Sequence, residues 1–371
     1  MMHDTLKQNF PKPLLYKPDF PQAAANMDRW WRGEDLGRPP LTLWGLQKEP
    51  RRVAPPASLE DRWFNIDGML DAAEAVFEAT EYLAEGVPYY CYDLGASLDA
   101  GFLGARYTLA QDTVWWEPFV EEWSKIPPFV FDEQNPLFRR VYAMMERACE
   151  RAQGKYLVGM PSMGGPLDIL AAVRGTDRLL LDFVDNPDEI RKRLDELADF
   201  YIAVLRKFWN LTAGAGVGGT HWWPTYGSAS SLISQNDFSI MISPAMFREI
   251  VLPSLERVTQ AFPNCIYHLD GPGALVHVKA LSTVQNIRAV MFCEGNGNDP
   301  IMRWFDALRE IQRTGKSVAQ GFPAGAELQM LANLDRRKML LLCGTALDYD
   351  IHRVLDNIVR YCAEHTGPSA N

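Results

Sequence analysis

Short apolar runs alternate with longer amphipathic segments along this 371-residue chain. Short apolar runs are typical of buried strands, whereas apolar positions spaced by three and four residues are typical of helices with one buried face. Eight runs are predicted as strands: 41–46, 88–93, 155–160, 217–222, 264–269, 287–293, 317–321 and 338–343. The run at 217–222 carries the weakest signal, because glycines interrupt it.

Three of the amphipathic segments show where helices begin. Asn186-Pro187-Asp188-Glu189 combines a capping residue, a first-turn proline and acidic side chains at the positive end of the helix dipole. Ser243-Pro244 opens a second helix, and a third begins at about residue 350. The predicted inward positions are Ile190, Leu194, Leu197, Tyr201, Leu205 and Phe208 in the first helix, Phe247, Ile250, Val251, Leu255 and Val258 in the second, and Ile351, Val354, Leu355, Ile358 and Cys362 in the third.

Strands that alternate with helices predict a parallel sheet, and eight such units predict a closed (β/α)8 TIM barrel. We therefore expect a single α/β barrel over residues 22–371. An open, doubly wound sheet is the alternative. Residues 1–21 have few periodic apolar positions and are predicted to form an N-terminal arm on the surface.

Composition narrows the class of protein. The net charge of −10 argues against nucleic acid and anionic membranes as partners. No apolar stretch approaches the roughly 20 residues of a membrane helix, and the N-terminus lacks the apolar segment of a signal peptide. The six cysteines form no C-x-x-C pair, which is typical of reduced thiols. We expect a cytoplasmic protein.

Candidate chemistry follows the predicted strands, because active sites of such barrels lie at the carboxyl ends of the strands. One apolar run leads directly into His268-Leu269-Asp270-Gly271. Residues i and i+2 of a strand share a face, so His268 and Asp270 are expected to point together toward a metal or a ligand. The alternative is a buried histidine that its carboxylate neighbour satisfies.

Other predicted strand ends and the loops after them contribute polar, aromatic and thiol side chains to the same rim. These residues are Asp93, Met163, His221, Trp222, Trp223, Asn236, Asp237, Cys293, Glu294 and Cys343. The presence of each residue at a strand end could also be explained by packing alone. Free cysteines, for example, are often buried, so Cys293 and Cys343 could simply cap apolar strands.

The order and spacing of several motifs resemble the uroporphyrinogen decarboxylase superfamily, and within it the branch of corrinoid- and zinc-dependent methyltransferases. The resemblance extends over about residues 22–365. The segments that carry it are Met160-Pro161-Ser162-Met163-Gly164-Gly165, Arg174-Gly175, Asn186-Pro187, Asp237, Ile242-Ser243-Pro244-Ala245-Met246-Phe247, Pro253, Tyr267-His268-Leu269-Asp270-Gly271, Gly315-Lys316 and Cys343-Gly344. The superfamily implies a (β/α)8 barrel with its site at the carboxyl ends of the strands.

Methyltransferases of this branch hold zinc through a His-x-Cys pair and a later cysteine. By position, the resemblance implies His268, Asp270 and Cys343 as the metal ligands. Asp270 stands where the family has the cysteine of that pair, so a carboxylate replaces a thiolate. Zinc accepts carboxylate oxygens as ligands. The decarboxylase branch instead uses an aspartate, which Asp93 matches, and a pair of arginines near the first strand. The segment 41–46 contains no arginine or lysine, so it has no positive charge to pair with a substrate that carries many carboxylates.

The resulting prediction is a methyltransferase that moves a methyl group between a small methylated substrate and cobalamin or another corrinoid, carried by a partner protein. Methoxylated aromatics or similar ethers are favoured, because a carboxylate-containing zinc site is harder than a thiolate site. Zinc would polarise the substrate oxygen, and Glu294, Asp237 or His221 would supply the proton, with Asp93 at the pocket wall. Trp222, Trp223, Met163 and Asn236 are predicted to bind the substrate. A decarboxylase, a non-catalytic ligand-binding barrel and a homodimer remain compatible with these features.

Overall fold

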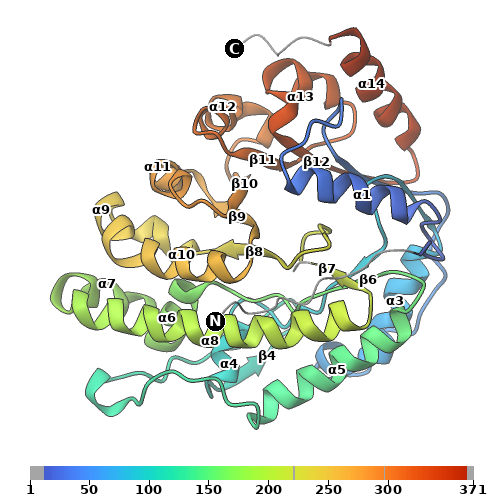
Figure 1. Cartoon of the computed structure of the whole chain (residues 1–371). Coiled ribbons are helices and arrows are strands. Elements are labelled where there is room, and N and C mark those ends of the chain that lie inside the picture. The colour runs from blue at the N-terminus through green and yellow to red at the C-terminus, as the bar shows by residue number, and fades with distance from the viewer. Residues whose placement is uncertain (1–11, 220–221, 296, 366–371) are drawn as a thin grey trace.

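The computed structural model describes residues 12–219, 222–295 and 297–365, and its strands lie inside a layer of helices (Figure 1). The strands are β1 (Leu41–Leu46), β2 (Thr80–Ala84), β3 (Tyr89–Tyr90), β4 (Tyr107–Leu109), β5 (Val114–Trp116), β6 (Leu157–Gly159), β7 (Gly218–Gly219), β8 (Ser231–Gln235), β9 (Asn264–Asp270), β10 (Ile287–Cys293), β11 (Ser317–Gly321) and β12 (Met339–Thr345).

The parallel strands form two arcs that follow the order of the chain. One arc runs β8, β9, β10, β11, β12 and β1, and the other runs β3, β6 and β7. An arc in chain order is typical of a barrel, whereas a doubly wound sheet reverses its order. Among the described residues the ladder does not close into a ring, because antiparallel β2 borders β1 and β7 is not hydrogen-bonded to β8. The fold is barrel-like, but the predicted closed ring of eight strands is not seen.

The helices account for most of the remaining chain. They are α1 (Phe20–Trp31), α2 (Leu59–Phe64), α3 (Ile66–Phe77), α4 (Leu98–Phe102), α5 (Pro136–Ala152), α6 (Pro166–Arg174), α7 (Thr176–Asp185), α8 (Pro187–Gly214), α9 (Pro244–Met246), α10 (Leu252–Ala261), α11 (Val278–Ser282), α12 (Phe305–Arg313), α13 (Glu327–Asn333) and α14 (Ile351–Glu364). Over the described residues, none of these helices is both long enough and apolar enough to span a bilayer.

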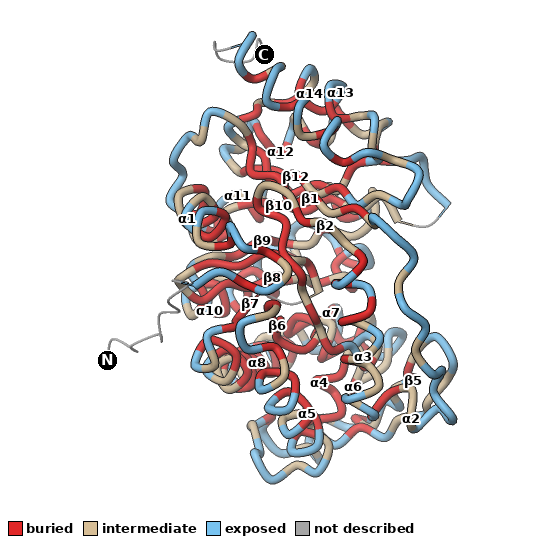
Figure 2. Tube along the Cα trace, turned by 90° about the vertical axis from the view of Figure 1, so that its right-hand side faces the viewer, coloured by how far each residue is buried: buried red, intermediate tan, exposed pale blue. Residues whose placement is uncertain are grey.

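Buried residues follow the central strands and the helix faces that cover them (Figure 2). They form two clusters, one on each side of the strands. The outer cluster lies between strands and helices and extends from Leu41 to Cys362. The inner cluster contains Ile233, Ile266 and Leu340 from the strands, together with one face of α1. Each of these three residues lies in the first half or at the middle of its strand, so α1 covers the amino end of the barrel-like interior. The opposite end remains available for a site.

The predicted helices are confirmed with small differences. α8 begins at Pro187 as expected, although Asn186 donates its amide to Asp182 Oδ1 and does not cap the helix through its side chain. All of the predicted inward positions of α8 are buried. The helix that begins at Pro244 has a π-helical turn over Phe247–Val251, immediately before Pro253. Proline cannot donate a backbone hydrogen bond, which accounts for the widened turn.

Three sequence expectations need correction. Strand β8 was not predicted, because buried Ser231 and Ser234 interrupt its apolar pattern. The predicted strand at 217–222 is reduced to the two glycines of β7, and residues 220–221 lie outside the described part. The expected surface arm is only partly at the surface, because Lys17 is buried and donates to Tyr82 O, and α1 already begins at Phe20.

Candidate functional site

The carboxyl end of β9 carries the pair that the sequence singled out. Ile266 belongs to the inner cluster, so alternation along the strand directs His268 and Asp270 to the same interior face. Gly271 follows with a φ of 76°, which a side chain would strain, and this turn ends the strand. The predicted common orientation of His268 and Asp270 is confirmed.

A third residue, Asp237, joins this pair from a neighbouring element. It opens the short 3-10 turn that follows β8, and β8 pairs with β9. One ligand atom from each of Asp237, His268 and Asp270 lies within 4.8 Å of the others. We call these three residues the rim cluster. It joins one residue predicted as catalytic to two residues predicted as metal ligands.

Burial changes the charge of Asp237. Desolvation raises the pKa of this carboxyl to about 8, and the charges of Asp168 and Asp270 add to the effect. Gln235 Nε2 donates to Asp237 Oδ2 over 3.3 Å, whereas Oδ1 is buried without a partner in the described structure. Asp168 accepts the Phe238 N–H through Oδ1, and its Oδ2 is also unpartnered. Burial therefore favours the protonated form of Asp237 at neutral pH.

His268 is held by an aromatic ring and a thiol. Burial lowers the pKa of His268, so the imidazole is neutral at pH 7, although the nearby Asp270 opposes this shift. Its Nδ1 lies 3.7 Å from Cys293 Sγ, and burial raises the pKa of that thiol to about 12. The Trp222 ring meets the imidazole edge to face, with centroids 5.0 Å apart. His268 can therefore act as a neutral ligand or hydrogen-bonding group in a fixed orientation.

Cys343 does not join the rim cluster, which corrects the predicted ligand set. Leu340 packs in the inner cluster and Leu342 packs against it, whereas Cys343 belongs to the outer cluster between strand and helices. Its side chain is 1% exposed, and burial, with a contribution from Glu327 of α13, raises the pKa of the thiol to about 11. Cys343 therefore faces away from His268, on the opposite side of its strand.

The rim cluster nevertheless fits a divalent cation. Two carboxylates and one imidazole are ligands that Zn²⁺, Mn²⁺ and Fe²⁺ all accept. The unpartnered Oδ1 of Asp237 is the kind of buried oxygen that a cation or a proton would satisfy. The residues that could hold zinc here are thus Asp237, His268 and Asp270, without a thiolate.

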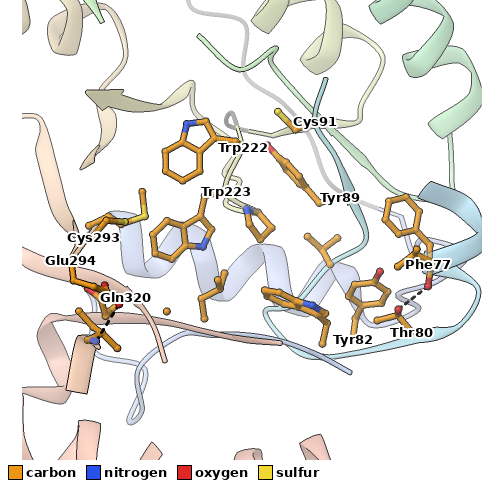
Figure 3. Close-up of a pocket in the computed structure, with 18 residues that line it drawn as sticks. Phe77, Thr80, Tyr82, Tyr89, Cys91, Trp222, Trp223, Cys293, Glu294 and Gln320 are labelled. Carbon is orange, nitrogen blue, oxygen red and sulfur yellow. Dashed lines mark hydrogen bonds between the residues drawn. The ribbon is translucent and has the colours of Figure 1, made fainter. Parts of the chain in front are cut away.

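Two cavities open beside the cluster. The first has a volume of about 630 Å³ and is bordered by Trp222, Trp223, Cys293 and Glu294 (Figure 3). The second has a volume of about 710 Å³ and is lined by polar residues that include Asp237. Trp222 borders both cavities, so its indole divides the two spaces at the point where it contacts His268.

The other predicted site residues are distributed around these cavities. Met163 and Asp93 line the second cavity, where burial raises the pKa of Asp93 and the Gly95 N–H opposes that shift. Asn236 lines neither large cavity, and its Oδ1 accepts the Leu167 N–H over 3.3 Å, which gives it a structural role. His221 lies outside the described residues.

Sequence reasoning missed several residues at the site. Asp168 lines the second cavity, and buried Asp99 accepts the N–H of Gly164, which lines the same cavity. Burial raises the pKa of Asp99 to about 7. The sequence analysis assigned neither acid to the site. Tyr82, Tyr89 and Gln320 line the first cavity, and nothing in their local sequence distinguishes them from core residues.

Comparison with protein-family models and with curated protein sequences finds no match for this chain. Among solved structures, a methyltransferase from Methanosarcina mazei is similar, with 12% sequence identity and a TM-score of 0.56. The similarity covers 93% of this chain and 99% of the other chain. At this level of identity the likeness shows a shared fold over nearly the whole length, which agrees with the barrel-like arrangement.

Proposed function

We propose that this protein is a methyltransferase that moves a methyl group between a small methylated substrate and a corrinoid, supplied as cobalamin or by a partner protein. The observation that carries this proposal is the aromatic cavity beside the rim cluster, at the end of the strands where barrel enzymes place their chemistry. The full-length resemblance in fold to the Methanosarcina methyltransferase supports it.

The reaction requires a cavity that excludes water and positions one methyl carbon. The bond between that carbon and the substrate heteroatom breaks, and its electron pair stays with the heteroatom. The bound corrinoid would supply the nucleophile that accepts the methyl group. Trp222 and Trp223 provide an apolar wall for the reacting centre, and the contact of the Trp222 ring with His268 holds that part of the wall in place.

The rim cluster matters most when the leaving atom is an oxygen, because an alkoxide or phenoxide is a poor leaving group. Burial favours the protonated form of Asp237, which lines the second cavity, so it can donate to an oxygen that reaches past Trp222 into that cavity. A zinc ion on Asp237, His268 and Asp270 would instead supply Lewis acidity. A ligand set of two carboxylates and one imidazole has no thiolate, so a zinc ion here would be hard and would suit an ether oxygen. The choice of substrate also depends on the lining of the cavity.

The proposal is tested by mixing the protein with reduced cobalamin and a panel of methoxyarenes, methylated ammonium ions and methyl thiols. We expect the absorbance change of cobalt methylation with one class. Trp222→Leu should lower kcat/KM at least about tenfold, since it opens the wall between the cavities. Trp115→Leu is the matched control, because Trp115 is 64% exposed on β5.

Three outcomes would contradict the proposal. If no compound methylates the corrinoid, the proposed methyltransferase activity is wrong. Release of carbon dioxide from a carboxylated compound would favour a decarboxylase instead. Tight binding of a panel compound without any turnover would favour a ligand-binding barrel that has no catalytic activity.

A further inference from the structure

The lining of the first cavity has a distinctive electrostatic character. Six aromatic side chains surround it: Trp44, Phe77, Tyr82, Tyr89, Trp222 and Trp223. Figure 3 shows Trp223 between the ring of Trp222 and the polar end of the cavity, where Glu294 and Gln320 lie side by side. Aromatic faces carry partial negative charge, so this wall attracts cations.

The polar end of the cavity offers acceptors. Glu294 uses Oε1 to accept the Ile301 N–H over 3.2 Å, and its second oxygen remains for a ligand. Gln320 is only 4% exposed, and its Oε1 has no partner in the part of the chain that the structure describes. The negative end of this buried amide dipole attracts a cation, whose polarised methyl groups can lie against the oxygen without a conventional hydrogen bond.

Neither cavity offers a positive charge. No lysine or arginine appears among the described residues that line either space, and the second cavity adds Asp93, Asp168 and Asp237. The whole chain carries a net charge of −10. A carboxylated substrate would therefore be repelled, and a neutral arene would bury the Glu294 carboxylate without compensation.

From these observations we infer that the first cavity binds a quaternary methylammonium ion, with the cation held between the indoles of Trp222 and Trp223 and the acceptors Glu294 and Gln320. This inference rests on the proposed methyl transfer and names its substrate class. Aromatic walls with a carboxylate at one end are a general solution for binding such ions, which have no N–H to donate.

The chemistry of this substrate is consistent with the site. When a methyl group leaves a quaternary ammonium for the corrinoid, the carbon–nitrogen electron pair remains on nitrogen and a neutral tertiary amine departs. The positive charge of the ammonium is thereby removed, and the amine leaves without a proton or a Lewis acid. A transfer of this kind does not require Cys343 or a metal at the rim cluster.

Binding can be measured without corrinoid, which separates this inference from the proposed activity. The probes are choline and its neutral carbon isostere, in which a tert-butyl group replaces the trimethylammonium group. We expect choline to bind roughly 30-fold more tightly by calorimetry, the preference that a desolvated cation–π site confers. Glu294→Gln and Trp223→Leu should each reduce that preference at least about fivefold. Asp306→Asn, at a fully exposed carboxylate of α12, should leave it unchanged.

Equal affinity for the two probes, or a preference that survives Glu294→Gln and Trp223→Leu in folded protein, would overturn the inference. Demethylation of methoxyarenes with no binding of choline would also overturn it while leaving the proposed activity intact. Selective choline binding without methylation of corrinoid would support the cation site and contradict the methyltransferase proposal.

Discussion

At the scale of single residues, the structure supplies protonation states that the sequence cannot. Asp237 was identified from its position after a strand, but its charge depends on neighbours that are distant in the sequence. Asp168 from α6 and Asp270 from β9 both face it, and burial makes the ionised form unfavourable. The sequence indicated that a carboxylate would lie at the rim, whereas the packing is what favours its protonated form.

This protonation predicts an unusual dependence of stability on pH. Unfolded aspartate has a pKa of about 4, so between about pH 4 and pH 8 the Asp237 carboxyl binds more protons in the folded protein than in the unfolded chain. The contribution of Asp237 to stability therefore falls as pH rises through this window, by up to about 1.4 kcal/mol per pH unit. Urea denaturation at several pH values, with a chelator present, measures this slope.

Asp237→Asn should remove much of that slope. Asparagine cannot ionise, and its amide can donate to the unpartnered oxygen of Asp168. Above pH 8 we expect the variant to be more stable than the native protein by about 1–3 kcal/mol, the usual effect of satisfying a buried polar atom. Parallel slopes for the two proteins would show that Asp237 is already ionised in the fold.

At the scale of elements, the prediction succeeded where strands alternate and failed where they do not. The polar positions His268 and Asp270 interrupt the apolar pattern of β9, so the inward face could be deduced from the sequence. In β12, positions 339–343 are apolar throughout, as in strands buried on both faces. Such a run does not reveal which residues face inward, and Cys343 was assigned to the wrong face.

The orientation of these two strands predicts which variants lose metal. Protein purified with zinc should bind a divalent cation through Asp237, His268 and Asp270. His268→Ala and Asp270→Asn should each weaken this binding by at least about tenfold in equilibrium dialysis. Cys343→Ser should bind zinc as the native protein does, because its thiol lies outside the interior. Cys343→Ser is therefore the control: we expect it to lower the stability of the protein without changing its affinity for zinc.

Cobalt provides a second readout for the same prediction. Co²⁺ bound by carboxylates and an imidazole should lack the ultraviolet charge-transfer band of a thiolate ligand. That band in the native protein, absent from Cys343→Ser, would restore the ligand set deduced from the sequence. Its loss in Cys293→Ser alone would instead add the thiol beside His268 to the site.

At the scale of the whole molecule, the alternation of strands and helices was sufficient to predict the class of fold. β1, β10 and β11 have the predicted bounds, because each is a clear apolar run between loops. Closure of the barrel depends on pairings between strands that are distant in the sequence. The antiparallel β2 at the edge of β1 and the division between β7 and β8 have no local signal.

The two ends of the barrel-like interior have different tasks. At the amino ends of the strands, Trp30 of α1 is buried, and its ring centroid lies 4.6 Å from that of Trp31. The Arg288 guanidinium carbon lies 5.7 Å from the centroid of the Trp30 ring. At the carboxyl ends, the cavities and the rim cluster remain accessible. In barrels of this kind the amino end serves stability and the carboxyl end serves chemistry.

Substitution of one tryptophan at each end tests this separation. Trp30→Ala removes a fully packed ring and should lower the free energy of unfolding by about 3–5 kcal/mol, as measured by urea denaturation. At temperatures where the variant remains folded, its preference for choline over the neutral isostere should match that of the native protein, because Trp30 does not line the first cavity. Trp222→Leu should show the reverse pattern, with weaker choline binding and a smaller loss of stability, since Trp222 is only half-buried. If Trp30→Ala abolished choline binding in folded protein, the packing of α1 and the first cavity would be coupled, and α1 would have to be counted as part of the site.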